Sequence, residues 1–104
     1  MYSYAALLVR VIDGDTARLT LDLGFGLQRV DQSYRFARIN APEMSTPEGP
    51  PSKIALEGYL TGKSLLANTS KPDKYGRSLV ELYADNVCVN DWLVSNQYAI
   101  YQTY

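Results

Sequence analysis

Histidine is absent from this sequence, and Cys88 is its only cysteine. Without histidine the chain can form no Ser–His or Cys–His catalytic triad and offers no imidazole ligand for zinc. It also lacks the commonest general base. A single cysteine excludes an internal disulfide bond and a zinc site built from several thiolates. Any catalysis must therefore be carried by carboxylates, arginine, lysine or tyrosine.

A large net charge and long apolar runs are also lacking. Ten Lys and Arg residues oppose eleven Asp and Glu residues, so the formal net charge is −1 and no overall positive field attracts nucleic acid. The apolar run at residues 5–9 is far shorter than the ~20 residues of a membrane span, and it lacks the flanks of a signal peptide. We therefore expect no membrane association and favour the cytoplasm, with a secreted mature form left open.

The sequence does have the composition of a globular protein. Its 104 residues are 46% hydrophobic and 20% charged, which is close to average usage and sufficient for one hydrophobic core. We find no internal repeat and no linker, so residues 1–104 are predicted to form a single domain, and we expect a monomer.

The first half of the chain has the pattern of three strands. Residues 5–12 are apolar-rich and end at a turn formed by Asp13-Gly14-Asp15, and residues 16–23 then alternate between polar and apolar, so the two segments predict a hairpin. Residues 32–39 predict a third strand with Tyr34 and Phe36 on the face opposite Arg35.

The second half is predicted to combine helices and strands. A proline-rich loop over residues 42–51 leads into a helix that begins at Pro51 or Ser52 and ends near Gly62. Strands follow at 65–69 and 78–83, then a helix with Asn90 as its N-cap, then an extended segment at 98–101.

Three groups of polar residues lie where predicted strands meet loops, at residues 13–16, 35–43 and 75–77. Ca²⁺ prefers oxygen ligands, which Asp15, Asn40 and the Ala41 carbonyl group would supply if the first two groups adjoin. Arginine presents a planar fork of donors to phosphate oxygens. Together these residue types suggest a site that cleaves phosphodiester bonds.

The same residues carry a resemblance to a known family. Segments 11–16, 34–43, 73–77 and 89–94 resemble, in order and separation, the motifs of the staphylococcal nuclease family, over about residues 9–99. The resemblance implies a mainly β, α+β fold: a five-stranded OB-type Greek-key barrel with two helices, here lacking a long C-terminal helix. It also implies Ca²⁺-dependent hydrolysis of DNA and RNA, mainly single-stranded, with metal and arginines stabilising a pentacovalent phosphate.

The resemblance assigns roles residue by residue. It places Asp15, Asn40 and Ala41 around the metal, and the carboxyl group of Asp13 beside the metal's water ligands. Arg35 and Arg77 match phosphate-binding arginines, Glu43 matches the carboxylate that orients or deprotonates water, and Lys74 and Tyr75 match residues that bind a terminal phosphate. Asn40 stands where an aspartate can occur, so one Ca²⁺ is expected to bind weakly, at ~10⁻⁴ to 10⁻³ M.

Other interpretations of these residues stay open. The Asp13-Gly14-Asp15 turn is equally typical of a solvated hairpin, and Arg35 and Arg77 of surface ion pairs with Glu43 or Glu81. Glu43 and Asn40 also suit loop caps and Asx turns. For the whole domain, the alternatives are a catalytically weak or inactive OB-fold module that binds nucleic acid, and a barrel with a purely structural or protein-interaction role.

Overall fold

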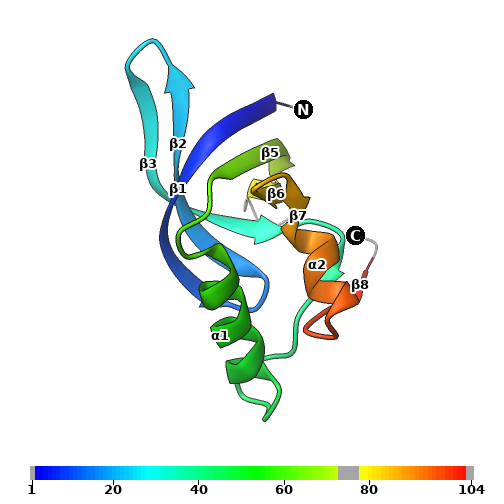
Figure 1. The fold of residues 1–104 in the computed structure, drawn as a ribbon. Coiled ribbons are helices and arrows are strands. Elements are labelled where there is room, and N and C mark those ends of the chain that lie inside the picture. The colour runs from blue at the N-terminus through cyan, green and yellow to red at the C-terminus, as the bar shows by residue number, and fades with distance from the viewer. Residues whose placement is uncertain (1, 73–77, 103–104) are drawn as a thin grey trace.

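The computed structural model describes residues 2–72 and 78–102, which form eight strands and two helices (Figure 1). Predictions for Lys74, Tyr75 and Arg77 lie outside the described residues. The strands are β1 (Tyr2–Asp13), β2 (Thr16–Gly24), β3 (Leu27–Phe36), β4 (Ile39–Asn40), β5 (Leu65–Pro72), β6 (Ser78–Ala84), β7 (Val87–Cys88) and β8 (Ile100–Tyr101). The helices are α1 (Gly49–Leu60) and α2 (Val89–Ser95).

Five of the strands close into a barrel, as predicted. β1 pairs antiparallel with β2 on one side and β5 on the other, β2 pairs with β3, and β5 pairs with β6. A parallel pairing of β3 with β6, from Tyr34–Ser78 to Phe36–Val80, completes the ring. β7 pairs antiparallel with the end of β6, while β4 and β8 form a separate two-stranded ribbon.

The core follows from the periodicity of the strands and the first helix. Along β2, Ala17, Leu19 and Leu21 alternate into the barrel and are buried. Along α1, Leu56 and Leu60 lie one turn apart and are buried with the strands. Neither helix in the described part of the chain has the length and apolar character needed to cross a membrane.

Two local predictions are wrong in detail. Helix α1 begins at Gly49 rather than at Pro51 or Ser52, because prolines are tolerated in a first helical turn, where the amides have no intrahelical partner. β3 ends at Phe36 because Arg38 adopts a φ of +67°. Arg35 is buried, as are its neighbours Tyr34 and Phe36.

The N-cap prediction for the second helix is also wrong. The N-cap residue of α2 is Cys88, and no side chain caps this helix. Asn90 lies inside the first turn and is completely buried. Its amide group instead bonds to the barrel, as described below.

An aromatic stack joins the two helices. The rings of Tyr59 in α1 and Trp92 in α2 are stacked with centroids 3.9 Å apart, and Tyr98 follows at 6.0 Å from Trp92. The ammonium group of Lys63 lies 4.1 Å from the Tyr59 ring centroid. Trp92 is therefore half-buried between helices rather than in the centre of the barrel.

Candidate active site

Asp15 connects the β1–β2 turn to the segment that follows β3. Its Oδ2 atom accepts a hydrogen bond from the Ala41 amide at 2.8 Å and lies 3.2 Å from Nη2 of Arg35. Its Oδ1 atom accepts a bond from the Thr16 hydroxyl group, and its own amide donates to Asp13 Oδ1. Asp15 is only 7% exposed, so a solvated hairpin turn does not describe it.

Arg35 is held at the end of β3 by backbone carbonyl groups. Its Nη1 atom donates to the carbonyl oxygens of Phe36 at 2.9 Å and Ile39 at 3.1 Å, and Nη2 donates to Oδ1 of Asn40 at 3.2 Å. Because Arg35 is buried against Asp15, it is not a surface arginine, and that interpretation is wrong.

Gly14 allows these two segments to meet. A Cβ atom at Gly14 would lie 2.8 Å from Cβ of Ala41 and 2.9 Å from Cβ of Ser52. Real Cβ atoms essentially never come so close, so a residue with a side chain would push the turn away from Ala41 and α1. The glycine therefore places Asp15 within reach of the Ala41 amide.

The loop before α1 positions Glu43. The Glu43 carbonyl oxygen accepts bonds from the amide and hydroxyl groups of Thr46, and Gly49 packs so closely that a Cβ there would lie 2.6 Å from Met44 Cα. The backbone of Glu43 is thus fixed while its side chain is exposed.

One cavity of about 410 Å³ brings the predicted residues together. It contains every predicted site residue in the described part of the chain, from four parts of the fold: the β1–β2 turn, β3, β4 and the loop before α1. The cavity is lined by Asp13, Asp15, Thr16, Arg35, Asn40, Ala41, Pro42 and Glu43. Thr16 and Pro42 lie within the polar groups at residues 13–16 and 35–43 that the sequence singles out, although no role was assigned to either.

Burial dominates the electrostatics of the cavity. It raises the pKa of Asp15 from 3.8 to about 6, and a hydrogen bond with Asp13 adds to this increase, whereas the Ala41 amide and the Arg35 charge oppose it. The carboxyl group therefore changes its charge near neutral pH. A perturbed carboxyl group in a polar cavity is typical of functional sites.

The donor set of the cavity fits a hard cation. The Asp15 carboxylate, the Asn40 amide oxygen and the Ala41 carbonyl group are all oxygen ligands, which suit Ca²⁺ better than a softer metal. Among residues 2–72 and 78–102, no three or more Asp, Glu, Cys or His side chains form a metal-binding group. A cation bound here would therefore be balanced by few negatively charged side chains.

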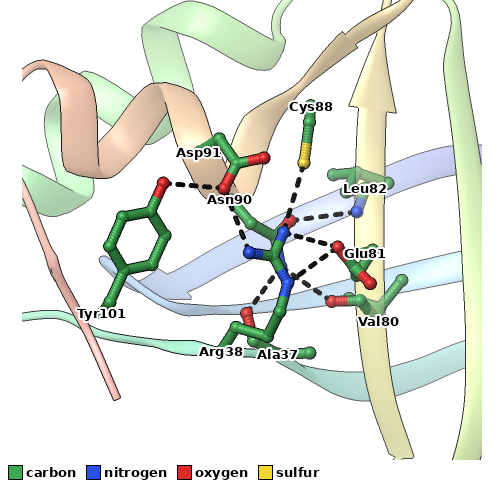
Figure 2. Close-up of polar contacts among 9 residues, drawn as sticks. All are labelled: Ala37, Arg38, Val80, Glu81, Leu82, Cys88, Asn90, Asp91 and Tyr101. Atoms are coloured by element: carbon green, nitrogen blue, oxygen red, sulfur yellow. Dashed lines mark hydrogen bonds and ion pairs between the residues drawn. The ribbon is translucent and has the colours of Figure 1, made fainter. Parts of the chain in front are cut away.

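Asn90 binds the segment that leads into the cavity. Figure 2 shows its amide group between two elements: Nδ2 donates to the carbonyl oxygens of Ala37 at 2.9 Å and Val80 at 3.1 Å, while Oδ1 accepts from the Leu82 amide at 3.1 Å. It thereby ties α2 and β6 to the segment that carries Asn40 and Ala41. Sequence reasoning missed this role because a capping asparagine and a buried one have the same local pattern.

A second, mainly apolar groove adjoins the cavity. It has a volume of about 190 Å³ and shares Asn40, Ala41 and Pro42 with the cavity. Its other wall is formed by residues 97–100. Asn40 pairs with Ile100 between β4 and β8, so the two side chains lie on one face of the ribbon, and Ile100 is 65% exposed.

The chain is similar to known proteins over most of its length. The family described as "Staphylococcal nuclease homologue" matches residues 33–104. An "Uncharacterized endonuclease" of Escherichia coli O157:H7 is 33% identical over 88 residues, which are 84% of this chain and 54% of that protein. "Probable staphylococcal-like nuclease CAN1" of Oryza sativa subsp. japonica is 35% identical over 69 residues, which are 66% of this chain and 21% of that protein.

The chain thus spans about half the length of the bacterial relative and less of the plant one. The family match nevertheless covers more than half of the chain, including Arg35, Asn40 and Glu43, and the fold is the barrel that the sequence predicts. On the combined grounds of sequence, barrel topology and cavity, the chain belongs to the staphylococcal nuclease family.

Proposed function

We propose that this chain hydrolyses phosphodiester bonds of DNA and RNA. The observation that carries the proposal is the single cavity in which a buried arginine, a buried aspartate, an amide and an exposed glutamate converge. The names of the related proteins, "Uncharacterized endonuclease" and "Probable staphylococcal-like nuclease CAN1", support the same chemistry.

Each of the described side chains has a separate role in the proposed hydrolysis. The Phe36 and Ile39 carbonyl groups fix the guanidinium group of Arg35 beside the cavity, where its positive charge would stabilise a bound phosphate. The exposed carboxylate of Glu43 orients or deprotonates the attacking water. The Asp13 carboxylate accepts a hydrogen bond from the Asp15 amide and so holds the backbone at Asp15.

The family resemblance adds residues that lie outside the described part of the chain. Arg77 is proposed as the second arginine on the reacting phosphate, and Lys74 and Tyr75 as donors to a terminal phosphate. Phosphate contacts of this kind position a nucleic acid without reading its sequence.

A matched pair of variants tests the role of Glu43. Glu43→Gln is expected to lower kcat for single-stranded DNA by on the order of 10²-fold, because it removes the base that acts on water. Glu48→Gln, an exposed change in the same loop, is expected to leave kcat within about twofold, since surface substitutions away from a site are usually neutral. Equal rates for Glu43→Gln and the parent contradict the assignment.

The cofactor proposed for the cavity is one Ca²⁺ ion, held by Asp15, Asn40 and the Ala41 carbonyl group. When bound, it supplies positive charge that stabilises the phosphate as negative charge develops. Asn40 contributes a neutral oxygen, so we expect a dissociation constant of ~10⁻⁴ to 10⁻³ M.

Replacing the amide with a carboxylate tests this site. Asn40→Asp adds a charge with almost no change of shape and is expected to tighten Ca²⁺ binding about tenfold or more, because affinity rises with the number of charged ligands. Asn96→Asp makes the same change of charge at the exposed end of α2 and should leave the affinity unchanged. Isothermal titration calorimetry measures both; micromolar binding by the parent contradicts the weak site.

The adjoining groove supports a preference for single strands. Its apolar wall, with the exposed Ile100 beside Asn40, offers a surface for the face of an unpaired base next to the reacting phosphate. In a duplex that face is stacked on its neighbours. Cleavage of a single strand should therefore be at least about tenfold faster than cleavage of the matching duplex, by analogy with the stacking energies of about 1–3 kcal/mol per base.

The neutral Asn40 also favours a second candidate, a monomeric module that binds nucleic acid and cleaves it poorly or not at all. Cleavage of single-stranded DNA with excess Ca²⁺, compared with chelator, separates the two. Ca²⁺-dependent cleavage supports the nuclease, whereas binding of the oligonucleotide without cleavage supports the module.

A further inference from the structure

The segment between β3 and the cavity is held on several sides. The Ala37 amide donates to the Val80 carbonyl oxygen at 2.9 Å, and the Gln102 amide donates to the Arg38 carbonyl oxygen at 2.8 Å. The segment leads directly into β4, formed by Ile39 and Asn40, and Asn40 lines the cavity. Its path thus determines where these residues lie.

Arg38 occupies an unusual place in this segment. Its φ of +67° lies in the left-handed region, which disfavours residues with a Cβ atom. Such a conformation persists only where surrounding contacts hold it. In Arg38 those contacts come from the side chain and from the bond between its carbonyl oxygen and the Gln102 amide.

The side chain of Arg38 bridges β6 and α2, as Figure 2 shows. Nε and Nη2 donate to Oε1 of Glu81 at 3.0 and 2.5 Å, and Nη1 donates to Oδ1 of Asp91 at 3.1 Å. Nη2 also lies 3.8 Å from Sγ of Cys88. The same Asp91 oxygen accepts a bond from the Tyr101 hydroxyl group at 2.9 Å, so the network extends to β8.

This network is coupled to the cavity through the next three residues. The Ile39 carbonyl oxygen and the Asn40 side chain both accept bonds from Arg35, and the Ala41 amide donates to Asp15. A shift of the backbone at Arg38 would therefore move acceptors of the buried guanidinium and a donor to the buried carboxylate together.

We propose that Arg38 is a positioning residue: its fork to Glu81 and Asp91 holds the backbone in the left-handed conformation that points Asn40 and the Ile39 carbonyl group at Arg35. This inference rests on the proposed function for its effect on cleavage. The pair with Asp91 persists at neutral pH, because the Arg38 hydrogen bond holds the pKa of the Asp91 carboxyl group below its usual value.

A matched pair of variants tests the ion pairs of Arg38 with Glu81 and Asp91. Arg38→Gln and Arg18→Gln each remove one guanidinium group from a partly exposed ion pair, and Arg18 pairs with Asp31 away from the cavity. We expect Arg38→Gln to lower kcat at least tenfold with KM within about threefold, since it misplaces groups of the reacting centre without removing substrate contacts. Arg18→Gln should leave both within about twofold.

Arg38→Gly separates the fork from the backbone strain. Glycine adopts positive φ without steric cost, so this variant keeps the backbone allowed but removes the ion pairs. It is expected to lose kcat as Arg38→Gln does. If either Arg38 variant of an active parent keeps kcat within twofold, or if Arg18→Gln loses as much as Arg38→Gln, the proposal is overturned.

Amide hydrogen exchange gives a readout that does not depend on cleavage. We expect the Ala41 amide to exchange at least tenfold faster in both Arg38 variants and at the parent rate in Arg18→Gln. If the parent proves inactive, the proposed nuclease function fails, but this measurement still tests the positioning role of Arg38. Unchanged Ala41 exchange in the Arg38 variants overturns that role. Faster exchange in the Arg38 variants and not in Arg18→Gln supports it.

Discussion

At the scale of single residues, the cavity depends on a buried carboxyl group whose partners only partly compensate its burial. Asp15 receives the Ala41 amide and faces Arg35, yet its pKa is raised to about 6 because burial outweighs both. The carboxylate is therefore held at a cost to stability. Such a cost is typical of residues kept for their chemistry.

The first consequence is a dependence of stability on pH in the absence of metal. The folded-state pKa of Asp15 is about 6 and its ordinary value 3.8, so the native state binds the proton more tightly than the unfolded state. This contribution to stability is fully present below about pH 4 and is lost as pH rises through about 6. At 1.36 kcal/mol per unit it amounts to at most about 3 kcal/mol.

Urea denaturation between pH 4 and 8 in the presence of a chelator measures this loss. Asp15→Asn should remove the decrease over that window, whereas Glu57→Gln, an exposed change in α1, should retain it. A parent whose free energy of unfolding does not fall between pH 4 and 7, relative to Asp15→Asn, shows that the carboxyl group is not desolvated.

At the scale of elements, close approach of backbones assembles the cavity. The β1–β2 turn touches the segment after β3 and the first turn of α1, because Gly14 has no side chain to separate them. Ser52 of α1 in turn donates to the Tyr98 carbonyl oxygen at 2.9 Å, which joins the helix to the wall of the groove.

Two glycine substitutions test this packing. Gly14→Ala places a Cβ within 3 Å of both Ala41 and Ser52 and is expected to destabilise the fold by about 1–3 kcal/mol, as overpacking does. Gly58→Ala, in α1 with nothing within 4 Å, should stabilise it by about 0.5–1 kcal/mol through helix propensity. Thermal or urea unfolding measures both, and a neutral Gly14→Ala would mean that the turn and α1 do not touch.

Element boundaries show where sequence reasoning was sufficient and where it was not. The strands of the first hairpin were predicted because alternation and the Asp-Gly-Asp turn are local signals. The end of β3 and the cap of α2 were missed because contacts with distant elements decide them. Arg38 bonds to Glu81, and Asn90 to Ala37, across more than 40 residues of sequence.

At the scale of the whole molecule, barrel closure brings together functional residues that are distant in the sequence. The parallel β3–β6 pairing fixes the end of β3. This end carries Arg35 and leads into the segment that ends at Asn40. The β2–β3 hairpin projects away from the helices, and its residues 22–30 are exposed (Figure 1). The molecule therefore has a packed barrel that positions the cavity and an exposed hairpin tip, residues 22–30, that contributes little to the core.

A pair of phenylalanines distinguishes these two parts. Phe36 is completely buried and Phe25 is fully exposed at the hairpin tip. Phe36→Ala should cost about 3–5 kcal/mol, whereas Phe25→Ser should change the free energy of unfolding by no more than about 0.5 kcal/mol. Urea denaturation is the measurement; a large loss from Phe25→Ser would show that the hairpin tip packs against something in the folded protein.

The sequence by itself determined the barrel, the turn at residues 13–15 and the candidates Asp15, Arg35, Asn40, Ala41 and Glu43, because periodicity, turn residues and motif order are local or linear properties of the chain. Only the tertiary structure decided that Asp15 and Arg35 are buried against each other, that Gly14 admits the contact with Ala41, and that Arg38 and Asn90 hold the approach to the cavity. Burial and close contact depend on which distant segments share a space, and barrel closure sets that arrangement.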